Sequence, residues 1–182
     1  MASTVTRRRP LVGEPVAVDL LNTRWVEGTT RRDLLDGVDG LRQWLGEAGL
    51  DTRFDADVRT LDRVLLARGA LAVLVDAPED AEATARLNEV LDHGFVRRRL
   101  RDGAPAVTVE FDDPAWGPAW TAAADYLDLL DAPDRIRGCA NPACVLHFFD
   151  TSRNGTRRWC SMSGCGNRAK AARHHARAAG RR

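Results

Sequence analysis

Apolar residues recur at helical spacing along most of the N-terminal part of the chain, which predicts a mainly helical structure there. The clearest runs extend from Leu34 to Leu50 and from Asp57 to Val75, where apolar positions fall three or four residues apart. A further helix is expected to begin near Pro78 and Asp80 and to end at His93-Gly94. Proline and acidic residues favour a first helical turn, and glycine favours a helix end.

Two shorter segments have a different character. Residues 16–22 form a short apolar run that predicts one or two helical turns. Apolar and polar residues then alternate over 95–101 and 106–111, on either side of Asp102-Gly103. Alternation around an Asp-Gly pair predicts a β-hairpin with a tight turn.

A last N-terminal helix is expected to begin at Asp112-Asp113-Pro114 and to end at Ala132-Pro133. Five of its residues are spaced for burial: Trp116, Trp120, Ala123, Leu127 and Leu130. We therefore predict a mainly α domain with a small β-hairpin over residues 1–134 and a separate small module over 135–182. The chain of 182 residues is long enough for one core of about 130 residues, but a module of roughly 45 residues needs additional stabilisation.

Cysteine spacing indicates what stabilises the small module. All four cysteines fall in the last 44 residues, as Cys139-x4-Cys144 and Cys160-x4-Cys165 with fifteen residues between the pairs. Two close pairs are typical of a tetrahedral thiolate site, and four soft ligands favour Zn2+, one ion per chain. Redox-active cysteines are the alternative. Disulfides would require export, and the apolar residues near the N-terminus are too interrupted to form a signal peptide.

The residues around the cysteines predict a treble-clef-like zinc finger, built from a knuckle, a β-hairpin and a helix. Asn141-Pro142 favours a turn between the first two cysteines. Strands are expected over 145–150 and 156–160, with Ser152–Gly155 as the turn between them, and a helix from Gly166 onward. His147 is an alternative metal ligand, although a strand histidine beside two phenylalanines is more often packed.

Charge divides the chain at the same place. Residues 135–182 carry eleven basic residues and one acidic residue, a net charge of +10. Residues 1–134 carry sixteen basic and twenty-five acidic residues, a net charge of −9. This asymmetry favours a nucleic-acid-binding tail, with docking of the tail on its own acidic domain as the alternative. No apolar run approaches the ~18 residues of a membrane span, so no membrane partner is expected.

Two motifs resemble a known family. The run from Cys160 through Cys165 to Gly166-Asn167-Arg168 is similar to the CGNR zinc finger. Upstream, the AVDLLNTR run over 17–24 and the LRQWLGEAGL run over 41–50 resemble the ABATE domain. The resemblance implies a stress-induced transcription regulator of bacterial, cytoplasmic type that binds DNA. It leaves a homodimer or a small-molecule effector, acting through the N-terminal domain, as open possibilities.

Helical geometry suggests which side chains contact DNA. We expect phosphate contacts from the tail helix and from the hairpin, through Arg153, Arg157, Arg158, Lys170, Arg173 and Arg177. We interpret Gly166, Asn167 and Arg168 primarily as residues that stabilise the finger, and only secondarily as contacts to nucleic acid. Arg168 is expected to bond carbonyl groups or metal-bound sulfurs, and Asn167 to brace the loop.

No catalytic motif stands out, and we expect no enzymatic activity. The N-terminal part has no glycine-rich phosphate loop and no nucleophile elbow. Asp19, Asn22 and Arg24 form a polar cluster that is interpreted as structural capping. A protein-interaction module, an RNA-binding module and a thiol-based redox sensor remain alternatives to DNA binding.

Overall fold

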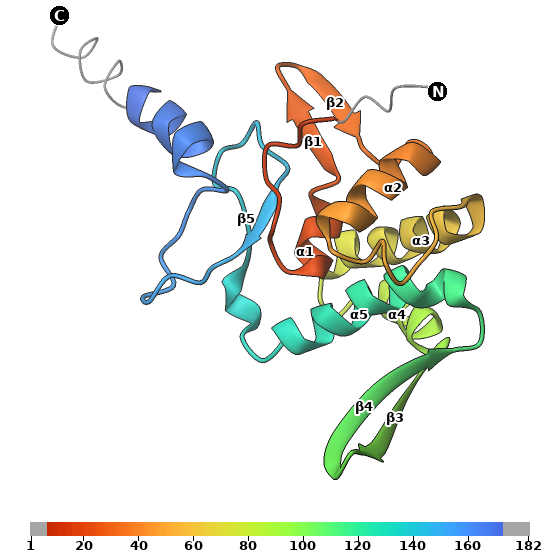
Figure 1. Cartoon of the computed structure of the whole chain (residues 1–182). Helices are drawn as coiled ribbons and strands as arrows, with labels where there is room; N and C mark the ends of the chain where they lie inside the picture. Colours follow the sequence, from red (N-terminus) through yellow and green to blue (C-terminus); the bar gives the residue numbers. More distant parts are fainter. Residues whose placement is uncertain (1–6, 173–182) are drawn as a thin grey trace, which may run out of the picture.

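The computed structural model describes residues 7–172, which form a group of helices with a finger packed against one side (Figure 1). The α-helices of the part before the finger are α1 (Val16–Leu21), α2 (Val38–Glu47), α3 (Val58–Leu74), α4 (Ala81–Leu91) and α5 (Gly117–Leu129). Helix α3 is central, since it packs against α1, α2, α4 and α5. None of the described helices is long and apolar enough to cross a membrane.

Within the described residues the strands form three separate antiparallel pairs. They are β1 (Arg24–Glu27) with β2 (Thr30–Asp33), β3 (Gly94–Arg101) with β4 (Ala104–Phe111), and β5 (Ile136–Gly138) with β6 (His147–Phe149). The predicted class, a mainly helical part with small hairpins followed by a small finger, is confirmed.

Aspartate side chains cap the N-termini of helices α3 and α4. The Asp57 carboxylate accepts a hydrogen bond from the Thr60 amide at 2.7 Å, and Asp80 accepts one from Ala83 at 2.8 Å. Such caps satisfy amides that have no partner within the helix. Helix α4 therefore begins after Asp80 rather than at Pro78.

The region from Arg24 to Leu35 differs from the prediction. The expected helix from Leu34 begins only at Val38; residues 34–37 form a turn, and the unpredicted β1–β2 hairpin lies before them. The Leu34 amide bonds the Thr23 carbonyl at 2.8 Å, which ties this turn to the base of the hairpin. Leu34 and Leu35 are nevertheless buried, as their apolar character required. Strand β2 is mostly exposed and therefore lacks the alternation that identifies a half-buried strand.

The buried face of helix α5 agrees only in part with the prediction: Trp116 and Ala123 are buried as expected, but the two leucines are not. Leu127 and Leu130 were expected in the core, but they are 46% and 40% exposed. The buried face consists mainly of Ala119, Ala122, Ala123 and Tyr126. Small residues let α5 approach α1 and α3 closely, and this packing outweighs the larger area that the leucines offer.

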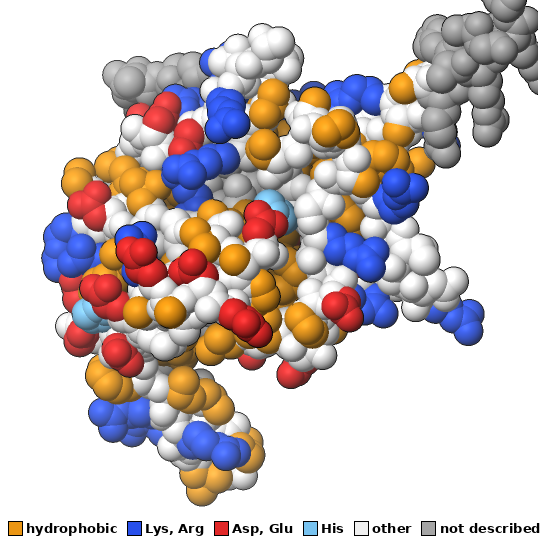
Figure 2. All heavy atoms as spheres, turned by 180° about the vertical axis from the view of Figure 1, so that it is seen from behind, with side chains coloured by type: hydrophobic (Ala, Val, Ile, Leu, Met, Phe, Trp, Pro, Cys, Tyr) orange, Lys and Arg blue, Asp and Glu red, His pale blue; other side chains and the backbone are white. Residues whose placement is uncertain are grey.

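Residues 94–111 form an arm that extends away from the helices (Figure 1). As predicted, Asp102 and Gly103 make its turn, both with positive φ (50° and 76°), which is the requirement of a type I′ hairpin. Leu100 and Val107 on this arm are 77% and 62% exposed. Seen from behind, the arm presents apolar and basic side chains (Figure 2).

The apolar core continues from the helices into the finger. Leu146, Phe148, Cys160 and Cys165 belong to the same buried cluster as the helical residues, and Phe148 is completely buried. Helix α1 packs against strand β6. The composition changes near residue 134, but the packing does not stop there.

Candidate metal centre and its basic surroundings

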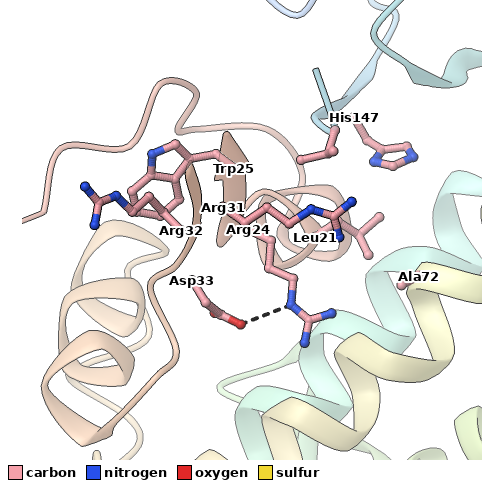
Figure 3. Close-up of a pocket in the computed structure, with 9 residues that line it drawn as sticks. Leu21, Arg24, Trp25, Arg31, Arg32, Asp33, Ala72 and His147 are labelled. Carbon is pink, nitrogen blue, oxygen red and sulfur yellow. Dashed lines mark hydrogen bonds and ion pairs between the residues drawn. The ribbon is translucent and has the colours of Figure 1, made fainter. Parts of the chain in front are cut away.

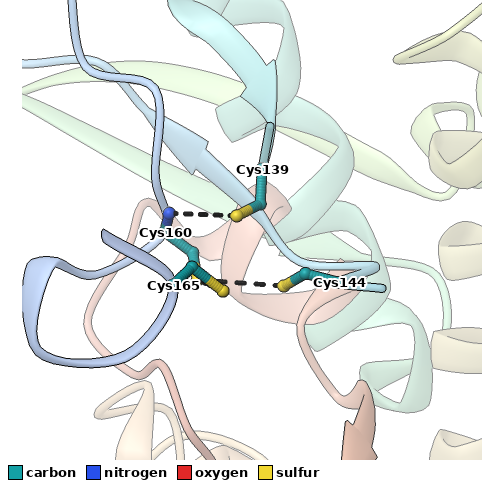
Figure 4. A group of neighbouring side chains, drawn as sticks. All are labelled: Cys139, Cys144, Cys160 and Cys165. Carbon is teal, nitrogen blue, oxygen red and sulfur yellow. Dashed lines mark hydrogen bonds between the residues drawn. The ribbon is translucent and has the colours of Figure 1, made fainter. Parts of the chain in front are cut away.

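Four cysteine side chains converge at one point of the finger (Figure 4). Their sulfur atoms all lie within 4.8 Å of one another. The Cys144–Cys160 sulfurs are 3.8 Å apart and the Cys160–Cys165 sulfurs 3.6 Å. With Zn–S bonds of about 2.3 Å, the edges of a regular tetrahedron measure about 3.8 Å. The four cysteines are therefore positioned to bind one metal ion, and their spacing and softness suit Zn2+.

Two local structures supply the ligands. Cys139 follows β5 and Cys144 precedes β6, so the two strands hold the knuckle, and the Cys144 amide bonds the Asn141 carbonyl at 2.8 Å. Cys160 precedes a helical turn of π type, Met162–Gly166, and Cys165 lies within it; the turn continues as α-helix over 167–172. The Ser161 hydroxyl caps this turn by accepting from the Gly164 amide at 3.1 Å.

The finger differs from the predicted hairpin in one respect. Residues 156–160 were expected to pair with 145–150, but they form no strand. Strand β6 pairs instead with β5, which precedes the knuckle, in the register Ile136 opposite Phe149. Pairing across the knuckle holds the first two cysteines together directly. The helical turn also begins at Met162, four residues before the predicted start at Gly166.

Nitrogen donors surround the sulfur atoms. The Arg168 guanidinium donates to the Cys165 sulfur at 3.0 Å, and the Asn141 amide group donates to the same sulfur at 3.3 Å. The Cys160 backbone amide donates to the Cys139 sulfur at 3.5 Å. Such donors stabilise thiolate over thiol and orient the ligands around the ion. Arg168 thus makes one of the two contacts expected for a bracing role, and the Asn167 side chain bonds the Ser163 carbonyl at 3.5 Å.

Proximity also sets the protonation of the thiols. A hydrogen bond from Cys160 lowers the pKa of Cys144 to about 5, whereas the same contact raises the pKa of Cys160. Burial raises the pKa of Cys139. One thiolate is therefore favoured, and each further negative charge is resisted by its neighbours. A divalent cation at the centre removes this repulsion, which is why the donor set fits a metal.

His147 does not join the ligand group. The metal-binding cluster found among the described residues contains the four cysteines alone. His147 begins β6, and burial is the main cause that lowers the pKa of its imidazole. Its backbone makes two bonds with the Asn22 side chain: the His147 amide donates to the Asn22 oxygen, and the Asn22 amide group donates to the His147 carbonyl, both at 2.9 Å.

Within the described residues, two side chains of the helical part form hydrogen bonds to the finger, and the first is Asn22. The second is Glu14, whose carboxylate accepts from the Phe149 amide and from the Arg157 guanidinium, both at 2.9 Å. Asn22 belongs to the AVDLLNTR run and is completely buried. The sequence of this run indicates only local capping, because nothing in it identifies a partner 125 residues away.

The other polar residues of the run have separate partners. Asp19 binds the buried Arg9 guanidinium at 2.7 Å, and Arg9 also contacts Glu47 of α2. Arg24 lies at the surface and pairs with Asp33 of the neighbouring strand at 3.0 Å. The three residues that looked like one cluster therefore serve three different contacts.

The structure divides the predicted basic contacts into two groups. Arg157 is turned inward: it stacks over the Phe148 ring at 4.2 Å, pairs with Glu14 and donates to the Cys160 carbonyl at 2.6 Å. Arg153, Arg158 and Lys170 are exposed. Arg173 and Arg177 lie outside the described residues.

Asp150, the one acid of residues 135–182, organises the loop that carries these arginines. It is completely buried and accepts from the Ser152 and Arg157 amides, both at 2.9 Å. The Arg135 guanidinium bonds the carbonyls of Asp150 and Ser152 at 2.6 and 2.9 Å. The internal bonds around Asp150 leave the exposed side of this part of the finger basic.

Comparison with known families agrees with this geometry. A model of the CGNR zinc finger matches residues 135–178. The ABATE family model, described as "Putative stress-induced transcription regulator", matches residues 14–133. No curated protein matches the chain. Because the ABATE match spans more than half of the sequence and the second match covers the metal centre, the chain belongs to the ABATE family and carries a C-terminal CGNR zinc finger.

Proposed function

We propose that the protein is a transcription regulator that binds duplex DNA through the exposed basic side of its zinc finger. The main observation in support is that Arg153, Arg158 and Lys170 are exposed on the finger, whereas its one acidic residue is buried. The family description supports a role in transcription regulation. The proposal includes no catalysis, because four thiolates fill a tetrahedral zinc shell and leave no position for a substrate.

Charge supports a polyanionic partner. Residues 135–172 carry seven basic residues and one acid. Four thiolates with one Zn2+ add about −2, so this part of the finger remains positive. Acidic side chains are more numerous over the helical part of the surface (Figure 2). A positive finger beside an acidic body orients the protein on DNA, since the body is repelled by phosphate.

The structure refines which residues belong to the proposed interface. Arg157 is left out, because its guanidinium is already engaged with Glu14 and with carbonyl groups of the finger. The proposed phosphate contacts are Arg153, Arg158, Lys170, Arg173 and Arg177. Contacts of this type give affinity and register rather than base specificity.

Salt dependence tests the proposal. With about five phosphates neutralised, the slope of log affinity against log salt is expected near −4.5, so raising salt from 50 to 200 mM weakens binding on the order of 10²–10³-fold. Replacing both Arg153 and Lys170 with glutamine is expected to flatten the slope by about two. Fluorescence anisotropy of the zinc-loaded protein on labelled duplex DNA measures both quantities.

Arg157→Gln is the matched control, because it removes the same charge from a guanidinium that faces inward. It is expected to lower the melting temperature while changing the slope by much less than the double variant. Binding that does not depend on salt, or tighter binding to single-stranded RNA than to duplex DNA, would contradict the proposal. The RNA result would favour an RNA-binding module instead.

A further inference from the structure

A cleft of about 330 Å³ lies where the helical part meets the finger (Figure 3). The β1–β2 hairpin forms one wall and helix α3 another, and the third wall is the start of β6 with the residue two positions before it. Its volume falls at the lower end of the range for small-molecule sites. Both family modules therefore contribute to one cavity.

The strand register determines which hairpin side chains face this cleft. Arg24 pairs with Asp33 and Val26 with Arg31, so Arg24, Arg31 and Asp33 share one face of the hairpin. Figure 3 shows Arg31 directed toward Leu21 and His147, and Arg24 extended toward Ala72 with its bond to Asp33, while Arg32 points away from both. Two guanidinium groups thus approach the same cavity.

The acid beside these arginines is already neutralised. Arg68 binds both oxygens of the Asp33 carboxylate, at 2.6 and 2.9 Å, and Arg24 binds one of them at 3.0 Å. Burial alone would raise the pKa of Asp33, but these arginines hold it below its usual range. Arg31 has no ion pair within the described residues. The cleft therefore keeps an uncompensated positive charge at Arg31.

The floor of the cleft is apolar. Leu21 of α1, Ala72 of α3 and Val145 of the finger line it, and Ala72 and Val145 are exposed. The half-buried His147 imidazole completes the lining. A free guanidinium above an apolar floor favours an anion that carries an apolar body.

We propose that this cleft binds a small monocarboxylate with an apolar body. The carboxylate lies against Arg31 and Arg24, because a guanidinium matches a carboxylate with two parallel hydrogen bonds. The apolar body lies on Leu21, Ala72 and Val145. Inorganic phosphate fits less well, since it leaves the apolar floor exposed to water.

The position of the cleft gives the ligand a regulatory consequence, which rests on the proposed DNA-binding function. The ligand contacts β2 of the ABATE domain and His147 of the finger at once. His147 is the residue that Asn22 holds at the junction. A ligand that contacts both modules favours the arrangement seen here over any in which they move apart.

Calorimetry and amide NMR of the zinc-loaded, full-length protein test the proposal. The probes are benzoate, phenylacetate and hexanoate, each compared with its neutral amide, and acetate as an anion without an apolar body. At least one carboxylate is expected to bind about tenfold more tightly than its amide and than acetate. Binding is expected to shift the amide signals of Arg31 and His147.

Two arginine variants separate a specific site from general charge. Arg31→Gln is expected to weaken carboxylate binding about tenfold, with an unchanged melting temperature because Arg31 is exposed and unpaired. Arg101→Gln removes the same charge from the exposed end of the arm and is expected to bind like the unmodified protein.

Three results would overturn the proposal: no carboxylate preferred over its amide, equal effects of the two variants, or duplex DNA shifting the Arg31 and His147 signals where carboxylates do not. The last result would assign this face to nucleic acid. Carboxylate binding is measured without DNA. A protein that binds carboxylate but no DNA would therefore disprove the proposed function and leave the cleft assignment intact.

Discussion

The β3–β4 arm and the junction between α1 and β6 show two opposite ways in which this chain forms structure. The arm is local: its strands follow each other directly, its turn is encoded by Asp102-Gly103, and much of its surface is exposed. The junction joins Asn22 to His147 across 125 residues, with Asn22 completely buried and His147 half-buried. The arm was recognisable from the sequence. The junction, which links the helical part to the metal centre, was not.

The difference shows that the ease of recognising an element is unrelated to its energetic importance. A hairpin turn needs only two residues with positive φ, which a short motif specifies. A buried side-chain amide, such as that of Asn22, that bonds both backbone groups of a distant residue produces no periodic pattern in the sequence. Its loss costs more, because both partners then remain buried without hydrogen bonds.

The largest expected effect comes from removing the metal. Cys165→Ser is expected to abolish stoichiometric zinc binding and to unfold the finger, because the sulfur that accepts from Arg168 and Asn141 is lost. The sequence alone predicts that the helical part survives largely intact. Since Phe148 belongs to the shared core, we expect the helical part to lose about 3–5 kcal/mol as well, comparable to removing a buried phenylalanine.

Elemental analysis and calorimetry, with and without a chelator, measure both consequences. Ser163→Ala serves as the control, because Ser163 is exposed in the same turn and is not a metal ligand. A helical part that melts at the same temperature with and without zinc would show that the two modules are energetically independent.

A smaller effect is expected from Asn22→Ala at the junction. The substitution leaves the His147 amide and carbonyl without their partner, which is expected to cost about 2–4 kcal/mol. Asn88→Ala on the exposed side of α4 is the matched control and should change the unfolding free energy by less than about 0.5 kcal/mol. Urea titration followed by circular dichroism distinguishes them. Equal stabilities would mean that water replaces the Asn22 bonds.

The smallest effect is expected in the arm. Leu100→Ser changes a side chain that is 77% exposed, so the unfolding free energy should change by less than about 0.5 kcal/mol. The same urea titration measures it, at two protein concentrations. A larger, concentration-dependent loss would show that the arm is buried against a second copy of the chain, and the contrast with the junction would disappear.

Several features of this protein follow from the sequence alone. The paired cysteines predicted the metal centre, because four thiolates at short spacing have few other uses in a reduced protein. The start of helix α4 was predicted near Pro78 and Asp80, because proline and acidic residues favour a first turn, and the helix begins after Asp80. The motif Gly166-Asn167-Arg168 identified the family that the comparisons then established.

Other features depended on the tertiary structure, because they arise from contacts between distant segments. Strand β6 pairs with β5 rather than with residues 156–160, a choice that local alternation cannot make. Arg157 and Arg158 are adjacent arginines, yet Glu14, 143 residues away from Arg157, turns one inward while the other stays exposed. The sequence determined the ligands and the helices. Packing determined which charged side chains remain free to meet a partner, because that depends on burial and on the position of the opposite charge.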